Sequence, residues 1–184
     1  MKNNILEYQK KLISTIETLD VDSVIKIAKV LINARNNNKT IYTIGNGGSG
    51  STASHMVCDI LKGCSFKKTK KFKIFCLNYN IPTILAYSND VSYDVVFEEQ
   101  LKNYLEPEDV LIAISGSGNS KNIINAVNYA KSINSKIIGF TGFDGGKLKQ
   151  LSNVSINANI NDMQISEDIH VICMHILYKL LENE

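Results

Sequence analysis

The chain has 184 residues, of which 44% are apolar and 21% are charged, and its formal net charge is +2. This length and composition fit a single domain over residues 1–184 with one well-buried core. The chain is too short to argue for two domains. The small net charge gives no electrostatic reason to expect a nucleic-acid partner. No run of about eighteen apolar residues is present, so a membrane span is not indicated.

The cysteines and the N-terminus indicate the cellular compartment. The four cysteines lack CxxC spacing and lie in or beside apolar runs, at positions Cys58, Cys64, Cys76 and Cys173. This pattern predicts reduced, buried thiols. The first eleven residues, MKNNILEYQKK, contain no apolar signal core. We therefore expect a cytoplasmic protein. The lysine-rich segment at residues 67–73 is interpreted as a solvated loop.

Residues 1–37 predict two helices. Apolar residues recur at helical spacing between residues 3 and 19, with polar residues between them. Asp20 or Asp22 can cap a second helix, whose apolar positions span too wide an arc for one core contact. We expect the surplus apolar surface to face another subunit, which makes this segment a candidate oligomerisation element.

The most informative stretch follows, at residues 39–63. A short apolar strand at residues 41–44 leads into a glycine-rich turn, GNGG, then a run of hydroxyls and a helix that carries His55 and Asp59 one turn apart. Glycines let a ligand approach the backbone closely, and the free amides of a helix start favour an anion. The turn matches neither the dinucleotide fingerprint nor a P-loop. A phosphate is the ligand that this junction fits best.

The remainder alternates between strands and helices. Apolar runs predict strands at residues 72–77, 110–115, 136–140 and 154–158. Residues 89–93 read as a turn, and helices are expected at about residues 94–105, 122–133 and 166–181, with a short helix after the glycines at 145–146. Such alternation predicts an α/β fold with a parallel sheet covered on both faces, and ligands beyond the carboxyl ends of its strands.

A second serine- and glycine-rich loop, SGSGNS at residues 115–120, also follows an apolar strand and starts a helix. It would therefore lie at the same edge of the sheet as the first loop. The hydroxyls and amides of the two loops could hold one phosphate between them. The simpler alternative is that serine and glycine are merely good turn formers.

Five motifs in order resemble the sugar-isomerase (SIS) domain family, and specifically its phosphoheptose isomerase branch. They are GNGGSGSTASH at 45–55, NDVSYDVVFEEQL at 89–101, ISGSGNSKN at 114–122, GFTGFDGG at 139–146 and EDIHVICMHIL at 167–177. The resemblance covers nearly the whole chain. It implies a flavodoxin-like, doubly wound five-stranded parallel sheet with an N-terminal helical extension, assembled as a homotetramer with sites at subunit interfaces.

The resemblance also implies a reaction. Members of the branch interconvert sedoheptulose 7-phosphate and D-glycero-D-manno-heptose 7-phosphate, precursors of surface glycans, by moving a proton through an enediol. It makes Asp59 and His175 the catalytic pair. The positions that match the substrate- and phosphate-binding residues of the family are Asn46, Ser49, Asp90, Ser115, Ser117 and Ser120.

A zinc ion, one per subunit, is a further implication. The family positions that hold it carry His55, Asp59, Glu167 and His175 here, and all four are competent ligands. Two of them depart from the family pattern. Asp59 is one methylene shorter than the usual Glu, so its carboxylate falls about 1 Å short of the usual reach. Glu167 replaces a neutral amide by a carboxylate, which binds a divalent cation more strongly or, without metal, repels Asp59.

Three further departures concern the substrate site. Gly116 occupies a position that usually carries a hydroxyl, and Gln164 stands where an Asp is usual. An arginine of the family has no counterpart near Gly63 and Cys64. The residues expected to bind the phosphate thus match the family pattern better than those expected to bind the sugar.

Several alternatives stay open on the sequence alone. His55 and Asp59 could be a simple helix pair. Either His170 or His175 could be a core histidine, and Glu167 with His170 would serve as a ligand pair as well as the set above. A different ketose phosphate could be the substrate. The chain could also be a noncatalytic SIS module that binds a sugar phosphate or a protein partner as a regulator.

Overall fold

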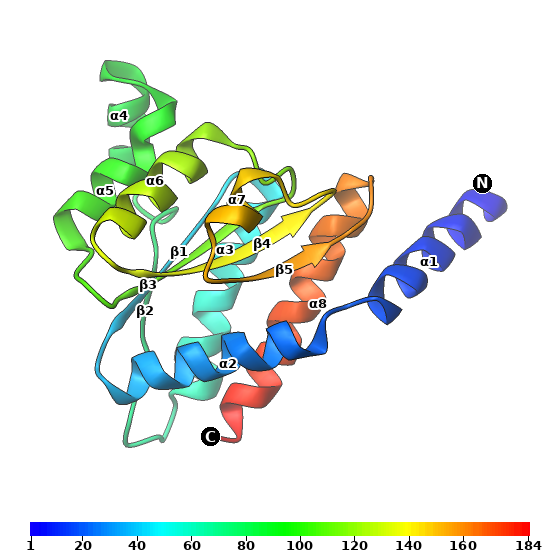
Figure 1. Cartoon of the computed structure of the whole chain (residues 1–184), viewed down its shortest axis with the longest axis horizontal. Coiled ribbons are helices and arrows are strands. Elements are labelled where there is room, and N and C mark those ends of the chain that lie inside the picture. Colours follow the sequence, from blue (N-terminus) through cyan, green and yellow to red (C-terminus); the bar gives the residue numbers. More distant parts are fainter.

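The structure is a computed structural model that describes residues 1–184, and its centre is a five-stranded sheet (Figure 1). Every neighbouring pair of strands is parallel. The spatial order is β2-β1-β3-β4-β5. The strands are β1 (Thr40–Gly45), β2 (Lys73–Cys76), β3 (Val110–Ser115), β4 (Lys136–Gly142) and β5 (Val154–Ala158). The predicted α/β fold class is confirmed.

Helices cover both faces of the sheet (Figure 1). One face packs against α2 (Val21–Asn36), α3 (Gly47–Asp59) and α8 (Met163–Glu182). The other face packs against α5 (Val96–Tyr104), α6 (Lys121–Ser132) and α7 (Gly146–Leu151). The remaining helices are α1 (Lys2–Glu17), α4 (Ile81–Asp90), the π-helical turn η1 (Ile60–Cys64) and the short η2 (Tyr93–Val95).

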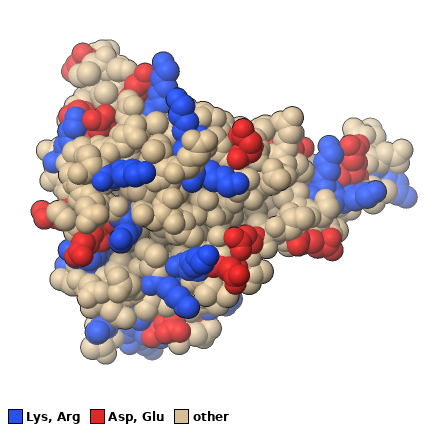
Figure 2. Space-filling view, in the orientation of Figure 1, with Lys and Arg blue, Asp and Glu red and all other residues tan.

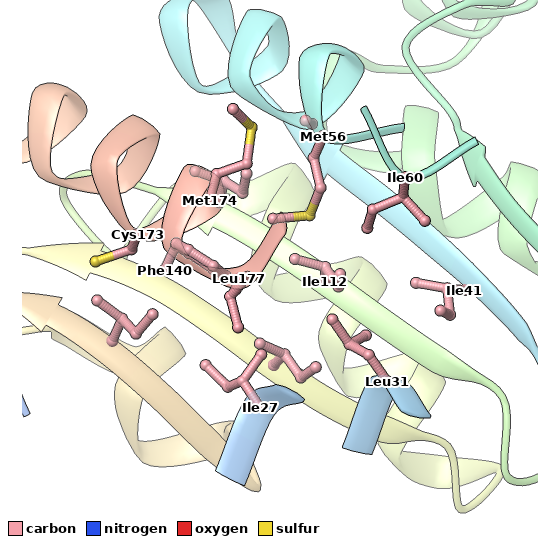
Figure 3. Close-up of a cluster of buried hydrophobic side chains, with 14 of the residues drawn as sticks. Ile27, Leu31, Ile41, Met56, Ile60, Ile112, Phe140, Cys173, Met174 and Leu177 are labelled. Carbon is pink, nitrogen blue, oxygen red and sulfur yellow. The ribbon is translucent and has the colours of Figure 1, made fainter. Parts of the chain in front are cut away.

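The alternation of side chains along the strands supplies both cores. In β3, Ile112 and Ile114 face the α2, α3 and α8 layer, whereas Leu111 and Ala113 face the opposite layer. Because all six residues of β3 are buried, the strand reads as an uninterrupted apolar run. Figure 3 shows how side chains of α3 and α8, including Met56 and Met174, meet over this sheet face.

Two helices contribute little to either core. Helix α1 projects from the body and buries only Thr15 (Figure 1). It is tied to α8 by a hydrogen bond of 2.5 Å from the Tyr8 hydroxyl to Asp168 Oδ2. Helix α4 buries no residue at all. Asp20 caps α2 by accepting from the backbone amide of Ser23, so the first of the two predicted caps is confirmed.

The thiols only partly follow the prediction. Three of the four free cysteines are buried, but Cys58 is exposed, so its expected burial was wrong. Cys58 lies on the solvent side of α3, whereas its neighbours Met56 and Val57 face the core. Burial raises the pKa of the Cys64 thiol to about 11 and that of Cys173 to about 12.

The surface agrees with the small net charge. Lysines, arginines and acidic residues are interspersed on the face shown in Figure 2, without one large patch of either sign. Most side chains of the lysine-rich loop at residues 67–73 are exposed, as predicted. None of the helices combines the length and the apolarity that a membrane crossing requires.

Two predicted boundaries were wrong in an instructive way. Asn89 and Asp90, read as part of a turn, belong to the last turn of α4. Helix α8 begins at Met163 rather than near residue 166, because Asp162 accepts from the amide of Ile165 and starts the helix earlier.

Candidate active site

The first part of the site is the junction between β1 and α3. Gly45 ends the strand where the chain passes so close to α3 that a Cβ would lie 2.4 Å from the carbonyl oxygen of Ser49. Asn46 precedes the helix, and its carbonyl accepts the first helical bond from Gly50, at 3.2 Å. No side chain accepts from the amides of residues 47–49. These amides therefore remain free for an anion.

The second part is the loop between β3 and α6. The hydroxyl of Ser115 lies 3.2 Å from that of Ser120, and Ser117 Oγ accepts from the amide of Asn119. Gly118 makes the loop possible because it adopts φ +64°, and its amide bonds the carbonyl of Ser115.

The two loops line one cavity of about 280 Å³ at the carboxyl edge of the sheet. Its polar lining includes five of the predicted binding residues, namely Asn46, Ser49, Ser115, Ser117 and Ser120. We call this the serine cavity. Its lining contains no lysine or arginine, so an anion bound here would be held by hydroxyls and backbone amides.

Glu167 also lines the serine cavity. Its carboxylate is packed against Gly48 so closely that a Cβ on Gly48 would lie 2.6 Å from both carboxylate oxygens. Glu167 forms no ion pair within the chain. A side chain at position 48 would therefore have to displace the end of the Glu167 side chain.

The third part is a cluster of two imidazoles and a carboxylate, which we call the His/Asp/His group. His55 Nε2 lies 3.4 Å from Asp59 Oδ2, and His175 Nε2 lies 3.8 Å from the same oxygen. The two rings meet edge to face with centroids 5.2 Å apart. The α-helical pitch places His55 and Asp59 on one face of α3, and α8 packs beside that face. The catalytic pair expected from the family resemblance thus lies within one chain.

The donor set of this group suits a divalent metal ion. The three potential ligand atoms all lie within 4.8 Å of one another. Ligands on a tetrahedral zinc ion, with bonds of about 2.0–2.1 Å, are about 3.4 Å apart, close to the two measured separations. Two imidazole nitrogens and a carboxylate oxygen are a donor set that zinc accepts. The three residues therefore fit a metal centre with a position left for a further ligand.

The fourth expected ligand lies elsewhere. Glu167 precedes His175 by eight residues on α8, a distance of about 12 Å along the helix axis. In the single chain it belongs to the serine cavity, and the group of potential metal ligands does not include it.

Of His170 and His175, which spacing in the sequence could not tell apart, His170 is the core histidine. It is fully buried, its Nε2 lies 3.0 Å from the carbonyl of Thr141, and its ring packs edge-on against Phe140. Its Nδ1 has no partner. Burial lowers the pKa of His170 and outweighs the bond to Thr141, which raises it. The buried ring is therefore neutral, whereas His175 is half-exposed beside Asp59.

One predicted binding residue is not brought to the cavity. Asp90 lies on the exposed end of α4, where it accepts from Asn89 Nδ2, and it does not line the serine cavity. Two residues that sequence reasoning did not single out do reach Asn46, namely Tyr93 and Asn122. Both lie inside the quoted family motifs, but no periodicity or spacing marks them.

Comparison with protein families gives a match to the SIS domain over residues 6–142. A probable phosphoheptose isomerase of Thermoplasma acidophilum is 34% identical over 166 residues, which cover 90% of this chain and 91% of the relative. A phosphoheptose isomerase of Helicobacter pylori is 33% identical over 182 residues, which cover 99% of this chain and 94% of the relative.

Comparison with solved structures supports the fold. The phosphoheptose isomerase GmhA from Neisseria gonorrhoeae superposes with a TM-score of 0.91 at 24% identity, covering 100% of this chain and 99% of the other. The superposition thus spans the whole chain and supports the five-stranded α/β fold.

Proposed function

The chain belongs to the SIS domain family, and on that basis we propose that it is an aldose–ketose isomerase which interconverts sedoheptulose 7-phosphate and D-glycero-D-manno-heptose 7-phosphate. The observation that carries the proposal is that an anion site and an acid/base group both lie along the contact between α3 and α8, which we call the seam. The serine cavity lies where Gly48 of α3 meets Glu167 of α8, and the His/Asp/His group lies farther along the same two helices. In support, two relatives of the chain are named probable phosphoheptose isomerase and phosphoheptose isomerase.

The spacing along this seam suits a seven-carbon substrate. Glu167 at the first end and His175 at the second are about 12 Å apart along α8, the rise of eight helical residues. An extended chain gains about 1.2 Å per bond, so the seven or eight bonds from the reacting carbons of a heptose 7-phosphate to its phosphorus span about 8–10 Å. Hydrogen-bond contacts at each end make up the difference. A substrate held at its phosphate by the serine cavity would thus present its carbonyl end to Asp59 and His175.

The chemistry needs a base that moves a proton between neighbouring carbons. In the ketose-to-aldose direction, Asp59 takes the proton from C1 and returns it to C2, while His175 moves the hydroxyl proton from O1 to O2. The common carboxylate oxygen lies near both imidazoles, so proton transfer among them needs no large movement. The short side chain of Asp59 requires that the substrate come closer to α3 than it would to a glutamate.

We also propose that the His/Asp/His group holds one zinc ion per subunit. His55, Asp59 and His175 would be its ligands from this chain, whereas Glu167 lies in the serine cavity and is not among them. When bound, zinc would polarise the substrate carbonyl and so lower the energy of the enediol. The residues of the chain would still bind and orient the sugar and move its protons.

The assembly that we propose is a homotetramer built through residues 1–37. In support, α1 exposes Ile5, Leu6 and Ile13 and buries only one residue. Large apolar side chains exposed together mark contact surfaces. Sedimentation of the purified chain tests this assembly, and a monomer at micromolar concentration would contradict it.

The free cysteines support a reducing, cytoplasmic setting.

The activity is tested with purified protein and sedoheptulose 7-phosphate, with and without added zinc. We expect aldose 7-phosphate to form, and Asp59→Asn to lower kcat by about 10²–10⁴-fold, the usual contribution of a general base. The affinity for inorganic phosphate should not change, because Asp59 lies at the other end of the seam.

Cys58→Ser provides the matched control, since Cys58 is the exposed neighbour of Asp59 on the same helix. It should leave turnover unaltered. Wild-type protein that binds the sugar phosphate but yields no aldose under either condition would refute the isomerase and favour a noncatalytic binding module. A panel of ketose phosphates with five to seven carbons tests the length argument.

A further inference from the structure

Asn46 has the backbone of a capping residue but does not cap. Its φ of −108° and ψ of 146° are the extended values typical of the residue that precedes a helix. An asparagine there normally accepts a hydrogen bond from the second or third helical amide, which in α3 belongs to Gly48 or Ser49. The side chain of Asn46 makes no such bond. The free amides of the serine cavity therefore depend on where this side chain is held.

The carboxamide oxygen of Asn46 is already occupied. Asn122 Nδ2 donates to Asn46 Oδ1 at 2.8 Å, and the Tyr93 hydroxyl donates to the same oxygen, also at 2.8 Å. A carboxamide oxygen has two lone pairs, so both are taken. Asn46 Nδ2 returns a bond to Asn122 Oδ1 at 2.9 Å. Three hydrogen bonds thus hold the side chain away from the helix amides.

The two residues that hold Asn46 are fixed by α6 rather than by α3. Asn122 is only 2% exposed, and its Oδ1 also accepts from the amide of Ile123. Tyr93 lies in a turn that is anchored to α6, because Asn125 Nδ2 donates to the carbonyl of Asp94 at 3.0 Å. The amide of Asn122 is thus buried in α6, and the turn that carries Tyr93 is tied to the same helix, although Tyr93 itself is 49% exposed.

We propose that Tyr93 and Asn122 are positioning residues that keep Asn46 from capping α3, and so leave the amides at residues 47–49 free for the substrate phosphate. The nature of the anion rests on the proposed function, whereas the holding of Asn46 does not. If these bonds are lost, Asn46 turns toward the amides and competes with the ligand for them. Phosphate affinity then falls although no group that touches phosphate has been removed.

The first experiment compares Tyr93→Phe with the wild type by calorimetric titration with inorganic phosphate. Inorganic phosphate lacks the sugar, so a direct contact between Tyr93 and the sugar does not enter the result. We expect binding to weaken about two- to fivefold, as for the loss of one of three neutral hydrogen bonds. Adding Asn122→Ala should weaken it further, to about tenfold or more. Tyr79→Phe is the control, because that exposed hydroxyl bonds the Ser54 carbonyl instead.

A second comparison separates positioning from direct contact. With Asn46→Ala no carboxamide remains to be held, so adding Tyr93→Phe should change phosphate affinity no further. If the losses from Asn46→Ala and Tyr93→Phe simply add, Tyr93 acts on the phosphate by itself and the inference is overturned.

A third measurement needs no phosphate. Hydrogen exchange of the Gly48 and Ser49 amides in the ligand-free protein should slow in Tyr93→Phe, because Asn46 now spends time bonded to one of them. Unchanged exchange at both amides would overturn the inference on its own. If the wild-type chain binds no phosphate, the proposed function is refuted and the free amides do not serve phosphate binding. Hydrogen exchange would then still show whether Tyr93 keeps Asn46 away from the helix amides.

Discussion

The two ends of the seam between α3 and α8 are built in different ways. The serine cavity lies between two loops that leave neighbouring strands, and hydrogen bonds between Asn46 and Asn122 join the segments that follow these strands. The His/Asp/His group is made of three side chains on the surfaces of two helices, and its imidazoles are 47% and 51% exposed. The sheet therefore fixes the first end, whereas only helix packing and side-chain rotamers fix the second. Strain in the loop backbone should therefore damage the first end most, whereas removal of one helix-borne side chain should damage the second.

The largest effect is expected from Gly118→Ala in the loop between β3 and α6, which we call the serine loop. Gly118 has φ +64°, and an added Cβ would lie 2.1 Å from the carbonyl oxygen of Gly145. Because that contact is backbone, it cannot move aside cheaply. We expect the free energy of unfolding to fall by about 2–5 kcal/mol and phosphate binding to be lost. Urea unfolding and calorimetric titration measure the two effects.

Gly47→Ala is the matched control. Gly47 also has positive φ, +51°, but no atom lies within 4 Å of its added Cβ. Only the conformational cost remains, about 1 kcal/mol. Equal destabilisation by the two variants would mean that the contact between the serine loop and the Gly145 loop does not constrain the cavity.

The next effect concerns metal binding at the other end. His55→Ala removes one ligand from the His/Asp/His group and should weaken zinc binding by at least about 10–100-fold, as even outer-shell changes do. The free energy of unfolding should stay within about 0.5 kcal/mol, because the side chain is half-exposed. Zinc titration in chelator-free buffer measures the affinity. Cys58→Ser, which removes a nearby thiol outside the group, should bind zinc as the wild type does.

Zinc binding that survives His55→Ala undiminished would place the ion elsewhere. Loss of phosphate binding in the same variant would show that the two ends are not independent. Either result would break the distinction between an end fixed by the sheet and its loops and an end fixed by helix packing.

The smallest effect concerns His170, the buried histidine of α8 that packs against β4. Burial lowers its pKa from the ordinary value of 6.5, so the folded chain resists protonation while the unfolded chain accepts it. Stability is then full above pH 6.5 and falls as the pH drops below it, by up to about 1.4 kcal/mol per pH unit for one proton. Urea unfolding at pH 7.5, 6.5 and 5.5 measures the slope.

His170→Gln keeps an N–H donor for the carbonyl of Thr141 but cannot titrate, so its slope over this pH range should be shallower. A slope in His170→Gln as steep as that of the wild type would assign the pH dependence to other groups.

Much of the fold was predictable because each buried strand is an apolar run that ends at a turn. The strands at residues 110–115 and 154–158 were predicted with the bounds that the structure has. The helix ends were less predictable, since they depend on which polar side chain caps. Asp162 starts α8 before the apolar pattern does, and Asn89 and Asp90 continue α4 past its last apolar residues.

The site was predictable in part, for a different reason. The resemblance selected His175 rather than His170, which spacing alone could not do because both lie among apolar residues of one helix. The placement of Glu167 and the bonds of Tyr93 to Asn46 could not be predicted, since they arise between elements far apart in the sequence. Local patterns predict what each loop offers, but only the packing of α8 and α6 decides which groups meet.

The burial of three of the four thiols has a practical consequence. At neutral pH almost no thiolate forms at Cys64 or Cys173, whose pKa values burial raises to about 11 and about 12, and Cys76 is buried as well. Cys58 alone is open to solvent, one residue before Asp59. A maleimide fluorophore or spin label would therefore attach to the unmodified chain at one place, beside the reacting end of the seam, and report occupancy there by spectroscopy.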